Sequence, residues 1–353
     1  MTYRYKINSE YKRIWQKKII DWYKINKRDL PWRKSQNQNF YRIWISEVML
    51  QQTIVKTVIP FYEKFIKKWP TLENFSKATL DEILFEWQGL GYYQRARNLY
   101  KAKEFLKKNK LKINSTFLKC IPGIGEYISC SISAILKNEN CAVIDSNIKR
   151  ILQRVFNLNE NNKLFKKQIS YIANELTPSS RNGIYCQSLM DFANLVCKVN
   201  TPLCNECTLK NMCNFENKIE NKKKKQTKIE KIGIGFFVNN EKSFLIEVSK
   251  KKLLEGLYSI PFSEFINKEK INEKKKINQI ILDWMTSNNI IKKYKVLGHV
   301  NHIFSHFHLK LFIVNINLDS KVNFKNYKWI KDKDFYKKPT STLMRKVKKK
   351  MIW

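Results

Sequence analysis

Ile121-Pro122-Gly123-Ile124-Gly125 forms a tight turn between two apolar segments with helical spacing. Pro122 cannot continue a helix, and the two glycines permit backbone angles that other side chains disfavour. A helix follows the turn, so its first backbone N–H groups point outward at the positive end of the helix dipole, which suits a phosphate. The pattern predicts a helix-hairpin-helix element, although the same kind of turn also serves simply to join two core helices.

An aspartate lies at the start of the next predicted helix. Asp145-Ser146-Asn147 directly precedes the helical run Ile148 to Val155, which carries Lys149. The hairpin followed by this aspartate resembles the Gly/Pro…Asp pattern of the helix-hairpin-helix DNA glycosylase superfamily. The resemblance implies an all-α domain in which Gly123, Gly125 and Lys149 contact the DNA backbone.

The charge balance of the chain is strongly basic. The 353 residues include 68 Lys and Arg against 30 Asp and Glu, a formal net charge of +38. This excess suits a polyanionic partner, because each cation that faces a phosphate releases condensed counterions. A coding composition rich in Lys, Ile and Asn would give the same excess without nucleic acid binding. Hydrophobic residues make up 43% of the chain, which at this length predicts two globular domains rather than disorder.

The sequence carries no recognisable membrane or secretion signal. No apolar run approaches the length of a membrane span, and Met1-Thr2-Tyr3-Arg4-Tyr5 lacks the apolar core of a secretory signal. We therefore expect a cytoplasmic, nucleoid-associated protein of bacterial type with no membrane partner.

Helical periodicity dominates the first two thirds of the chain, because apolar residues there recur three and four positions apart. The predicted helices are Ser9–Lys27, Tyr41–Thr53, Val55–Trp69, Leu80–Trp87, Tyr92–Lys107, Ile148–Val155, Leu164–Leu176 and Gly183–Val196.

One of these helices holds a carboxylate in an unusually apolar setting. Glu47 stands among Trp44, Val48 and Leu50, and a glutamate on the solvent face of its helix would be the ordinary interpretation. However, the phrase Ser-Glu-Val-Met-Leu-Gln-Gln-Thr, residues 46–53, closely resembles the catalytic helix of the adenine DNA glycosylases. The resemblance implies that Glu47 is catalytic and that Gln52 contacts DNA.

The connection before the helix Tyr92–Lys107 is rich in glycine, tyrosine and arginine. Its sequence is Gly-Leu-Gly-Tyr-Tyr-Gln-Arg-Ala-Arg-Asn, residues 89–98. Glycines let the backbone approach a partner closely, and aromatic side chains beside arginines can enter a DNA stack. A plain helix–helix turn with core tyrosines would have a similar composition. The string resembles the wedge segment of the same family, which implies that Tyr92 contacts DNA.

Four of the eight cysteines crowd into the stretch Cys197-x6-Cys204-x2-Cys207-x5-Cys213, which is compact enough to wrap a single metal centre in a reducing compartment. Zinc ribbons usually pair two CxxC motifs, whereas this stretch contains one. The spacing resembles the endonuclease III-type loop, which implies one structural 4Fe–4S cluster that holds Lys198 and Lys210 against DNA. The other cysteines, Cys120, Cys130, Cys141 and Cys186, are interpreted as small buried hydrophobes.

Composition changes after residue 215. Residues 216–231 are polar and rich in lysine, with Lys222 to Lys225 in a row, and predict a basic linker. Beyond it the period becomes that of strands. Ile232–Val238 and Phe244–Val248 predict a hairpin through Asn239-Asn240, Leu309–Ile316 predicts a strand, and Ile271–Met285 predicts a helix. This mixture is typical of a small α+β domain.

All four histidines lie between His299 and His308. Alternation along a strand would spread them over both faces, which disfavours a zinc site. The phrase His-x-Phe-Ser-His-Phe-His instead resembles the lesion-reading segment of the Nudix-like domain of adenine DNA glycosylases, and implies Phe304, Ser305 and His306 as reading residues. The sequence lacks the Gly-x5-Glu-x7-Arg-Glu-x2-Glu-Glu string that would hold magnesium, so this domain is expected to bind and not to hydrolyse.

The resemblance covers nearly the whole chain in the family's order. It implies an all-α helix-hairpin-helix glycosylase domain over residues 1–215 with an iron–sulfur loop at 197–213, a linker at 216–231, and a smaller α+β Nudix-like domain over 232–353. It further implies a monomeric adenine DNA glycosylase of base excision repair. Such an enzyme flips out adenine that faces 8-oxoguanine or guanine in double-stranded DNA and removes it by hydrolysis. Proteins that process abasic sites are the expected downstream partners.

This chemistry requires an acid and an anion. Adenine is a poor leaving group until protonated, so a carboxylic acid with a raised pKa is needed, and Glu47 among apolar residues suits that role. The sugar develops oxocarbenium character, and Asp145 at a helix start suits a carboxylate beneath it, with Asn147 positioning Asp145 or water. By resemblance, Arg33 and Asp191 line the adenine pocket.

Tyr127 occupies the position where bifunctional relatives carry a lysine that forms a Schiff base. A phenol cannot do amine chemistry, so we expect base removal without efficient strand cleavage. Further departures from the family pattern are Ser146, where a glycine is common in the family, and Ala193-Asn194.

Two alternatives to an adenine DNA glycosylase are an endonuclease III-like glycosylase/lyase for oxidised pyrimidines and a non-catalytic iron–sulfur DNA-binding protein. In the second, Glu47 and Asp145 would be ordinary surface and cap residues.

Overall fold

The computed structural model describes residues 7–215, 229–250, 253–268 and 273–351. The chain divides into two compact units, one made of Met1–Lys77 and Asn98–Asn221, the other of Ala78–Arg97 and Lys222–Trp353. Most of the predicted linker 216–231 lies outside the described residues, and its last three residues begin the first strand, β1 (Ile229–Asn240). The predicted domain boundary therefore stays a prediction.

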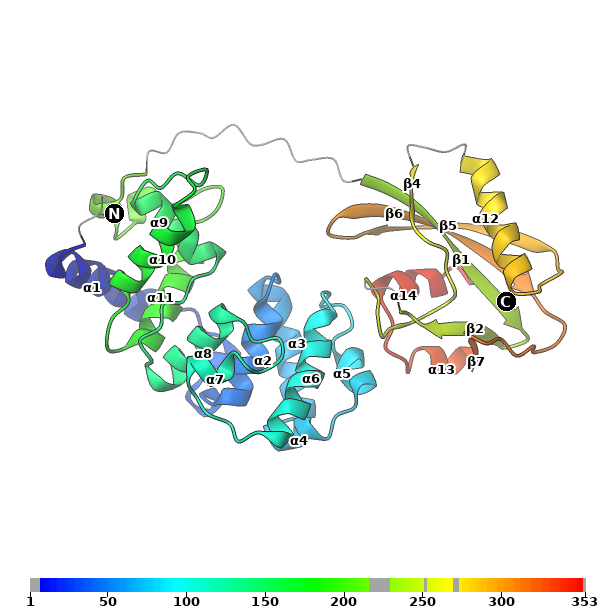
Figure 1. Cartoon of the computed structure of the whole chain (residues 1–353), viewed down its shortest axis with the longest axis horizontal. Coiled ribbons are helices and arrows are strands. Elements are labelled where there is room, and N and C mark those ends of the chain that lie inside the picture. The colour runs from blue at the N-terminus through cyan, green and yellow to red at the C-terminus, as the bar shows by residue number, and fades with distance from the viewer. Residues whose placement is uncertain (1–6, 216–228, 251–252, 269–272, 352–353) are drawn as a thin grey trace. The chain divides into compact units, whose positions relative to one another are not determined.

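The first unit is helical, as the periodicity predicts (Figure 1). Its helices are α1 Ser9–Asn26, α2 Phe40–Leu50, α3 Val55–Lys68, α4 Leu72–Ser76, α7 Ser115–Leu118, α8 Glu126–Lys137, α9 Ser146–Val155, α10 Phe165–Leu176 and α11 Asn182–Leu195. Helix α6 (Gln94–Lys108) begins in the second unit and continues in the first. Short 3-10 turns lie at Pro31–Arg33, Ser35–Asn37, Cys204–Glu206 and Lys210–Met212.

Helix α11 lies at the centre of the first unit and contacts α1, α8 and α9. Trp15 and Ile19 of α1 are one helical turn apart and both fully buried, so α1 turns a single apolar stripe toward the core. The indole of Trp15 donates to the hydroxyl of Tyr185 on α11 at 2.8 Å. Helices α8 and α11 approach so closely that a Cβ on Gly183 would lie 2.6 Å from the Ala134 carbonyl oxygen.

The predicted hairpin joins α7 to α8. Gly123 has φ +83°, and a Cβ there would lie 2.6 Å from the Cβ of Asn98. Both its backbone angle and its neighbour therefore require glycine at this position. Gly125 precedes α8, whose first turn receives no side-chain cap, so the helix-hairpin-helix prediction is confirmed.

The second unit contains a mixed sheet in the order β3-β2-β1-β6-β5. Its central strand β1 pairs parallel with β6 and antiparallel with β2, while β4 pairs with β1 and β7 with β2. The remaining elements are α5 Leu80–Glu86, β2 Ser243–Val248, β3 Tyr258–Ser259, β4 Ile266–Asn267, α12 Glu273–Ser287, β5 Tyr294–Ile303, β6 Phe307–Asn317, β7 Lys328–Lys331, α13 Asp332–Phe335 and α14 Thr342–Lys348.

Helix α12 packs on β1 (Figure 1). Trp284 of this helix stacks on Phe236 of the strand, with ring centroids 3.9 Å apart. A sheet covered by helices confirms the predicted α+β class for this part of the chain.

The β1–β2 turn lies further along the chain than the sequence predicts. Asn240 pairs with Ser243, and the chain reverses at Glu241, whose φ is +49°, rather than at Asn239-Asn240.

Of the four cysteines interpreted as buried hydrophobes, Cys130 and Cys186 are buried, whereas the interpretation was wrong for Cys120 and Cys141. Cys130 on α8 forms a disulfide with Cys141, Cys120 is exposed, and Cys186 alone is a buried free thiol among the described residues. Asn138 ends α8 in the left-handed conformation at φ +53°. The chain therefore folds back along the helix and brings the two Cα atoms to 5.5 Å.

Candidate active site

Glu47 projects from the middle of α2, between the buried Ser46 and Val48. The hydroxyl of Ser131 on α8 donates to its Oε1 atom at 3.1 Å. Its Oε2 atom is buried and receives no well-aligned hydrogen bond from the described residues. Burial raises the pKa of Glu47 to about 7, against the opposing effects of Ser131 and the Tyr127 hydroxyl. The carboxyl group is therefore set up to hold a proton near neutral pH.

Tyr127, in the first turn of α8, is brought against this carboxyl group. Burial raises the pKa of its phenol well above the usual value, and the negative charges of Glu47 and Asp145 raise it further. Tyr127 therefore stays neutral and serves as a hydrogen-bonding neighbour of the acid.

Asp145 caps α9. Its Oδ1 atom accepts from the backbone N–H groups of Asn147 and Ile148, each at 2.8 Å, and Oδ2 accepts from the Asn147 side chain at 2.8 Å. Burial raises the pKa of Asp145, while these donors and the charge of Arg150 favour its ionised form. Its charge in turn raises the pKa of Glu47, so the two predicted catalytic carboxylates act on each other electrostatically.

Asp191 on α11 is completely buried and joins the cations of Arg28 and Arg33. It accepts four hydrogen bonds: from Arg33 Nη1 at 2.7 Å and Nη2 at 2.9 Å, and from Arg28 Nε at 2.7 Å and its backbone N at 2.9 Å. These bonds hold the pKa of Asp191 below its usual range despite burial. The charge of Arg33 also lowers the pKa of Glu47, so Asp191 orients a cation that acts on the Glu47 carboxyl group.

Gln52 and Tyr92 both lie in turns with left-handed backbones. Gln52 follows α2 with φ +56°, and Tyr92 precedes α6 with φ +48°. Both side chains are exposed, Tyr92 by 45%. Residues other than glycine rarely adopt this conformation unless the surroundings fix it. The predicted start of a helix at Tyr92 was wrong, because the helix begins at Gln94.

The predicted lesion-reading residues occupy the turn between β5 and β6. Phe304 belongs to an aromatic cluster, with ring centroids 4.6 Å from His302, 4.8 Å from Phe307 and 6.5 Å from Phe265. Ser305 and His306 are exposed, and the hydroxyl groups of Ser305 and Tyr92 lie 3.4 Å apart. The phenylalanine thus anchors the turn, while the polar side chains stay accessible.

The four clustered cysteines are half-buried free thiols. The charges of Cys213, Cys197 and Cys204 all act on Cys207, and Arg154 donates to Cys197 Sγ at 3.4 Å. Cysteine sulfur with an N–H donor directed at it is the ligand chemistry of an iron–sulfur cluster. Nevertheless, within the described ranges no group of three or more His, Cys, Asp or Glu side chains is arranged to hold a metal ion.

Sequence reasoning missed four side chains that organise this site. Ser131 and Arg28 contact the predicted residues directly, as described above. Arg150 donates to the Cys197 and Ala193 carbonyls, each at 3.0 Å, and Arg154 to the Lys198 carbonyl at 2.6 Å. The spacing of these two arginines on one face of α9 was the available signal, but nothing local indicated that this face meets the cysteine loop.

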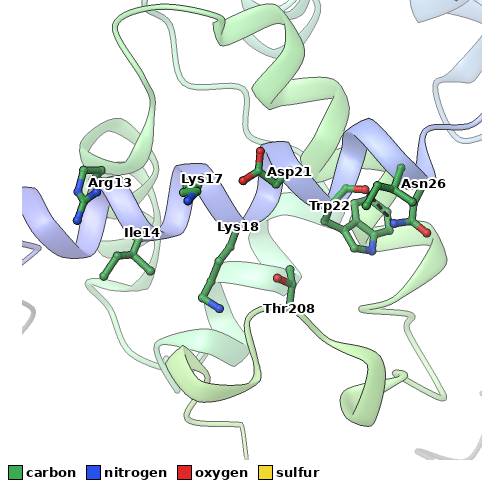
Figure 2. Close-up of a pocket in the computed structure, with 9 residues that line it drawn as sticks. Arg13, Ile14, Lys17, Lys18, Asp21, Trp22, Asn26 and Thr208 are labelled. Atoms are coloured by element: carbon green, nitrogen blue, oxygen red, sulfur yellow. Dashed lines mark hydrogen bonds between the residues drawn. The ribbon is translucent and has the colours of Figure 1, made fainter.

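An open pocket of about 500 Å³ lies along α1, separate from these residues (Figure 2). Its lining comes from α1 and from Thr208, next to Cys207, and comprises Arg13, Ile14, Lys17, Lys18, Asp21, Trp22, Ile25, Asn26 and Thr208. None of the predicted catalytic residues lines this pocket, so it forms no part of the candidate active site.

None of the helices in the described ranges is long and apolar enough to cross a membrane.

Comparison with known proteins assigns the fold and the family. The family description of HhH-GPD superfamily base excision DNA repair proteins matches residues 45–178. The chain is 34% identical over 328 residues to the adenine DNA glycosylase of Buchnera aphidicola subsp. Schizaphis graminum, covering 89% of this chain and 91% of that protein. It is 36% identical over 306 residues to the adenine DNA glycosylase of Buchnera aphidicola subsp. Baizongia pistaciae, covering 83% of each.

Among solved structures, a thermostable thymine-DNA glycosylase superposes with a TM-score of 0.52 at 25% identity, over 58% of this chain and 95% of that one. This match supports the fold of the helical part, and the curated relatives extend over most of the sequence. The chain therefore belongs to the adenine DNA glycosylase family, whose members are DNA N-glycosylases of base excision repair.

Proposed function

We propose that the protein removes adenine from duplex DNA in which the adenine faces 8-oxoguanine or guanine. The observation that carries the proposal is the carboxyl group of Glu47, whose pKa burial raises to about 7. An acid of this pKa is substantially protonated at neutral pH and still a good proton donor, which is the combination that general acid catalysis needs.

The reaction breaks the bond between adenine and its sugar. Because this bond lies inside the duplex, the adenine must first be flipped out of the stack. Glu47 donates its proton to the base as the C–N bond breaks, and the Asp145 carboxylate offsets the positive charge that develops on the sugar. Water then adds to the sugar carbon, and the proton that it loses returns to Glu47. Asn147 holds Asp145 at 2.8 Å through its amide.

We expect the reaction to stop at the abasic site. Strand cleavage by related enzymes needs an amine that forms a Schiff base with the sugar. Tyr127 faces Glu47 and Asp145 at the corresponding position, and its phenol cannot form this bond. The product is therefore free adenine and an intact strand that breaks only after treatment with alkali.

Discrimination between mispaired and normal adenine must come from the opposite base, because the adenine itself is chemically the same in both. The exposed Ser305 and His306 offer a hydroxyl and an imidazole to groups that 8-oxoguanine carries and guanine lacks. The aromatic cluster around Phe304 keeps their turn in place. The hairpin glycines Gly123 and Gly125, Lys149, Gln52 and Tyr92 supply the proposed contacts to the rest of the duplex.

We further infer that Cys197, Cys204, Cys207 and Cys213 hold one 4Fe–4S cluster, which the family generally carries. The cluster would supply a rigid crosslink and takes no part in bond cleavage. Arg150 and Arg154 tie the backbone of residues 197–199 to α9, the helix that begins at Asp145. Ordering the cysteine loop would therefore also order the catalytic aspartate.

The function is tested with purified full-length protein on duplexes that contain one 8-oxoguanine:adenine pair, one guanine:adenine pair or one thymine:adenine pair. We expect release of adenine from the first two, strand breaks only after alkali, and no reaction with the third. Strand breaks without alkali would contradict the expected lack of lyase activity. Release of an oxidised pyrimidine with no release of adenine would favour the endonuclease III-like alternative. Tight duplex binding without any base release would favour the non-catalytic alternative.

The cluster has its own test. Protein purified with its metal should be brown and contain about four irons per chain, and Cys207→Ser should lose iron and DNA affinity. Cys120→Ser, at an exposed cysteine outside the stretch, is the matched control and should keep both. Colourless protein with one zinc per chain would contradict the iron–sulfur cluster and favour a zinc site.

A further inference from the structure

The turn that carries Tyr92 has a strained backbone. Gly89, Gly91 and Tyr92 all have positive φ, at +102°, +77° and +48°. A tyrosine in this region is costly and persists only where neighbouring groups fix the conformation. The contacts around residues 89–93 therefore determine whether the Tyr92 side chain is presented in its exposed position.

One set of contacts comes from the turn's own helices. Trp87 Nε1 and Arg95 Nη2 both donate to the Gly91 carbonyl, at 3.0 and 3.1 Å. The Arg95 guanidinium also lies 5.4 Å from the ring centroids of Tyr92 and Trp87, which places it against both rings. These contacts hold the turn from within, and they do not depend on the C-terminal part of the chain.

A second set comes from the C-terminal part of the same unit and converges on Gln88. Gln88 directly precedes the turn and is buried, with 8% of its surface exposed. Its amide donates to the Lys338 carbonyl at 3.3 Å, and its oxygen accepts from Arg345 Nη2 on α14 and from the Thr340 hydroxyl at 3.5 Å. Each polar atom of the buried amide is thus bonded to a residue more than 200 positions away in sequence.

The same segment makes further contacts of this kind. Arg97 Nη1 donates to the Glu255 carbonyl at 2.5 Å and Nη2 lies 3.4 Å from the Glu255 carboxylate. At the tip of the turn, the Tyr92 hydroxyl lies 3.4 Å from that of Ser305. The base and the tip of the turn are therefore both joined to the part of the chain that contains the proposed lesion-reading residues.

We propose that Gln88 and Arg345 are positioning residues for lesion recognition, because their contact sets the turn that presents Tyr92 to DNA. The inference deepens the proposed function and rests on it. Tyr92 and Ser305 would touch the DNA, whereas Gln88 and Arg345 act only through the turn. Losing the Arg345 donor leaves the buried Gln88 oxygen with the longer bond from Thr340, and an acceptor buried without a strong partner favours a rearranged turn.

The test compares Arg345→Met with Lys349→Met in the full chain. Both variants remove one exposed cation, Arg345 from within α14 and Lys349 from its C-cap, but Lys349 makes none of the contacts described above. We expect Arg345→Met to lower the preference for 8-oxoguanine:adenine over guanine:adenine about tenfold in single-turnover competition, a change worth about 1.4 kcal/mol. Lys349→Met should match the wild type. Arg345→Lys keeps a cationic donor and should recover most of the preference.

Two measurements separate positioning from a general loss of structure. A 2-aminopurine placed beside the lesion reports insertion of Tyr92, and its response should weaken in Arg345→Met while the melting temperature stays near that of Lys349→Met. The double variant Gln88→Leu with Arg345→Met should be no worse than the more affected single variant, because the two side chains act as one contact.

The inference is overturned if Arg345→Met keeps the wild-type preference and fluorescence response. It is also overturned if the variant loses activity on both pairs equally, in proportion to a fall in melting temperature. A wild-type protein that releases no adenine from either pair would instead contradict the proposed function, so the two failures are distinguishable.

Discussion

Glu47 and Asp145 belong to the same unit, but their carboxyl groups receive different numbers of hydrogen bonds from the protein. Glu47 lies within α2, where the backbone N–H groups are used inside the helix, and its carboxyl group is met by two hydroxyl groups, those of Ser131 and Tyr127. Asp145 lies at the start of α9, where free N–H groups point toward it, and it receives three hydrogen bonds. Burial raises the pKa of both groups, but only Asp145 has donors enough to support a charge. Local environment, rather than residue type, thus separates the proposed acid from the proposed anion.

The largest effect expected from this comparison is that of Glu47→Gln. The amide has nearly the same shape but no acidic proton, so single-turnover release of adenine should fall roughly 10²- to 10⁴-fold. Binding to the lesion duplex should change little. Glu63→Gln makes the same charge change on the exposed face of α3 and is the matched control. A Glu47→Gln rate near that of Glu63→Gln would remove Glu47 from the mechanism.

Asp145→Asn tests the other side of the comparison. Asparagine caps a helix as well as aspartate, so the two backbone hydrogen bonds of α9 can be kept while the charge is lost. The rate should fall roughly 10²- to 10³-fold, because the developing positive charge on the sugar is no longer offset. In urea unfolding, the free energy of unfolding should fall by about 1 kcal/mol at most, because the Asn147 amide loses the carboxylate oxygen to which it donates. A large loss of stability with a proportionate loss of rate would instead make Asp145 a structural cap.

The two environments also predict how stability depends on pH. The pKa of Glu47 is about 7 in the folded protein, whereas a glutamate side chain outside the folded structure has a pKa of 4.5. The folded state therefore holds this proton more tightly than the unfolded state, and ionisation opposes folding. The free energy of unfolding should decrease as pH rises from about 4.5 to about 7, by on the order of 3 kcal/mol from this group. Burial of Asp145 acts with the same sign.

Glu47→Gln supplies the measurement, because it removes the titrating group. The variant should be about as stable as the wild type at pH 5 and more stable at pH 8 in urea unfolding. In the wild type, the rate of adenine release should fall as pH rises through about 7, since the protonated form is the active one. Equal stability of the two proteins at both pH values would mean that Glu47 is not held protonated by burial.

Much of this site could be expected from sequence because its signals are local. The hairpin glycines, the helix start at Asp145 and the apolar neighbours of Glu47 all lie within a few residues of the groups that they affect. Local patterns of this kind depend on backbone angles and helix periods, which neighbouring residues largely determine. Tyr127 was identified differently, by resemblance, because it occupies the position where bifunctional relatives carry a lysine.

The contacts that sequence reasoning missed join residues far apart in the chain. Arg28 and Asp191 are 163 residues apart, and Ser131 and Glu47 are 84 apart. Gln88 meets Arg345 across an even longer interval. No periodicity encodes such pairs, because they depend on how whole helices pack. The disulfide between Cys130 and Cys141 was missed because it depends on a single left-handed residue, Asn138, that reverses the chain.

The smallest predicted effect concerns the Ser131 hydroxyl beside Glu47. The Ser131 hydroxyl bonds to Oε1 at 3.1 Å and stabilises the charged form of the carboxyl group. In Ser131→Ala the pKa of Glu47 should rise further, and the alkaline limb of the rate profile should move up by about half to one pH unit. Adenine release should then be a few times faster than in the wild type at pH 8 and unchanged at pH 6. Ser129→Ala removes an equally buried hydroxyl from the same helix, one that bonds to the Glu126 carbonyl, and should leave the profile in place. A profile that shifts toward acid in Ser131→Ala would mean that Ser131 stabilises the protonated acid, and would contradict the effect given to its hydroxyl here.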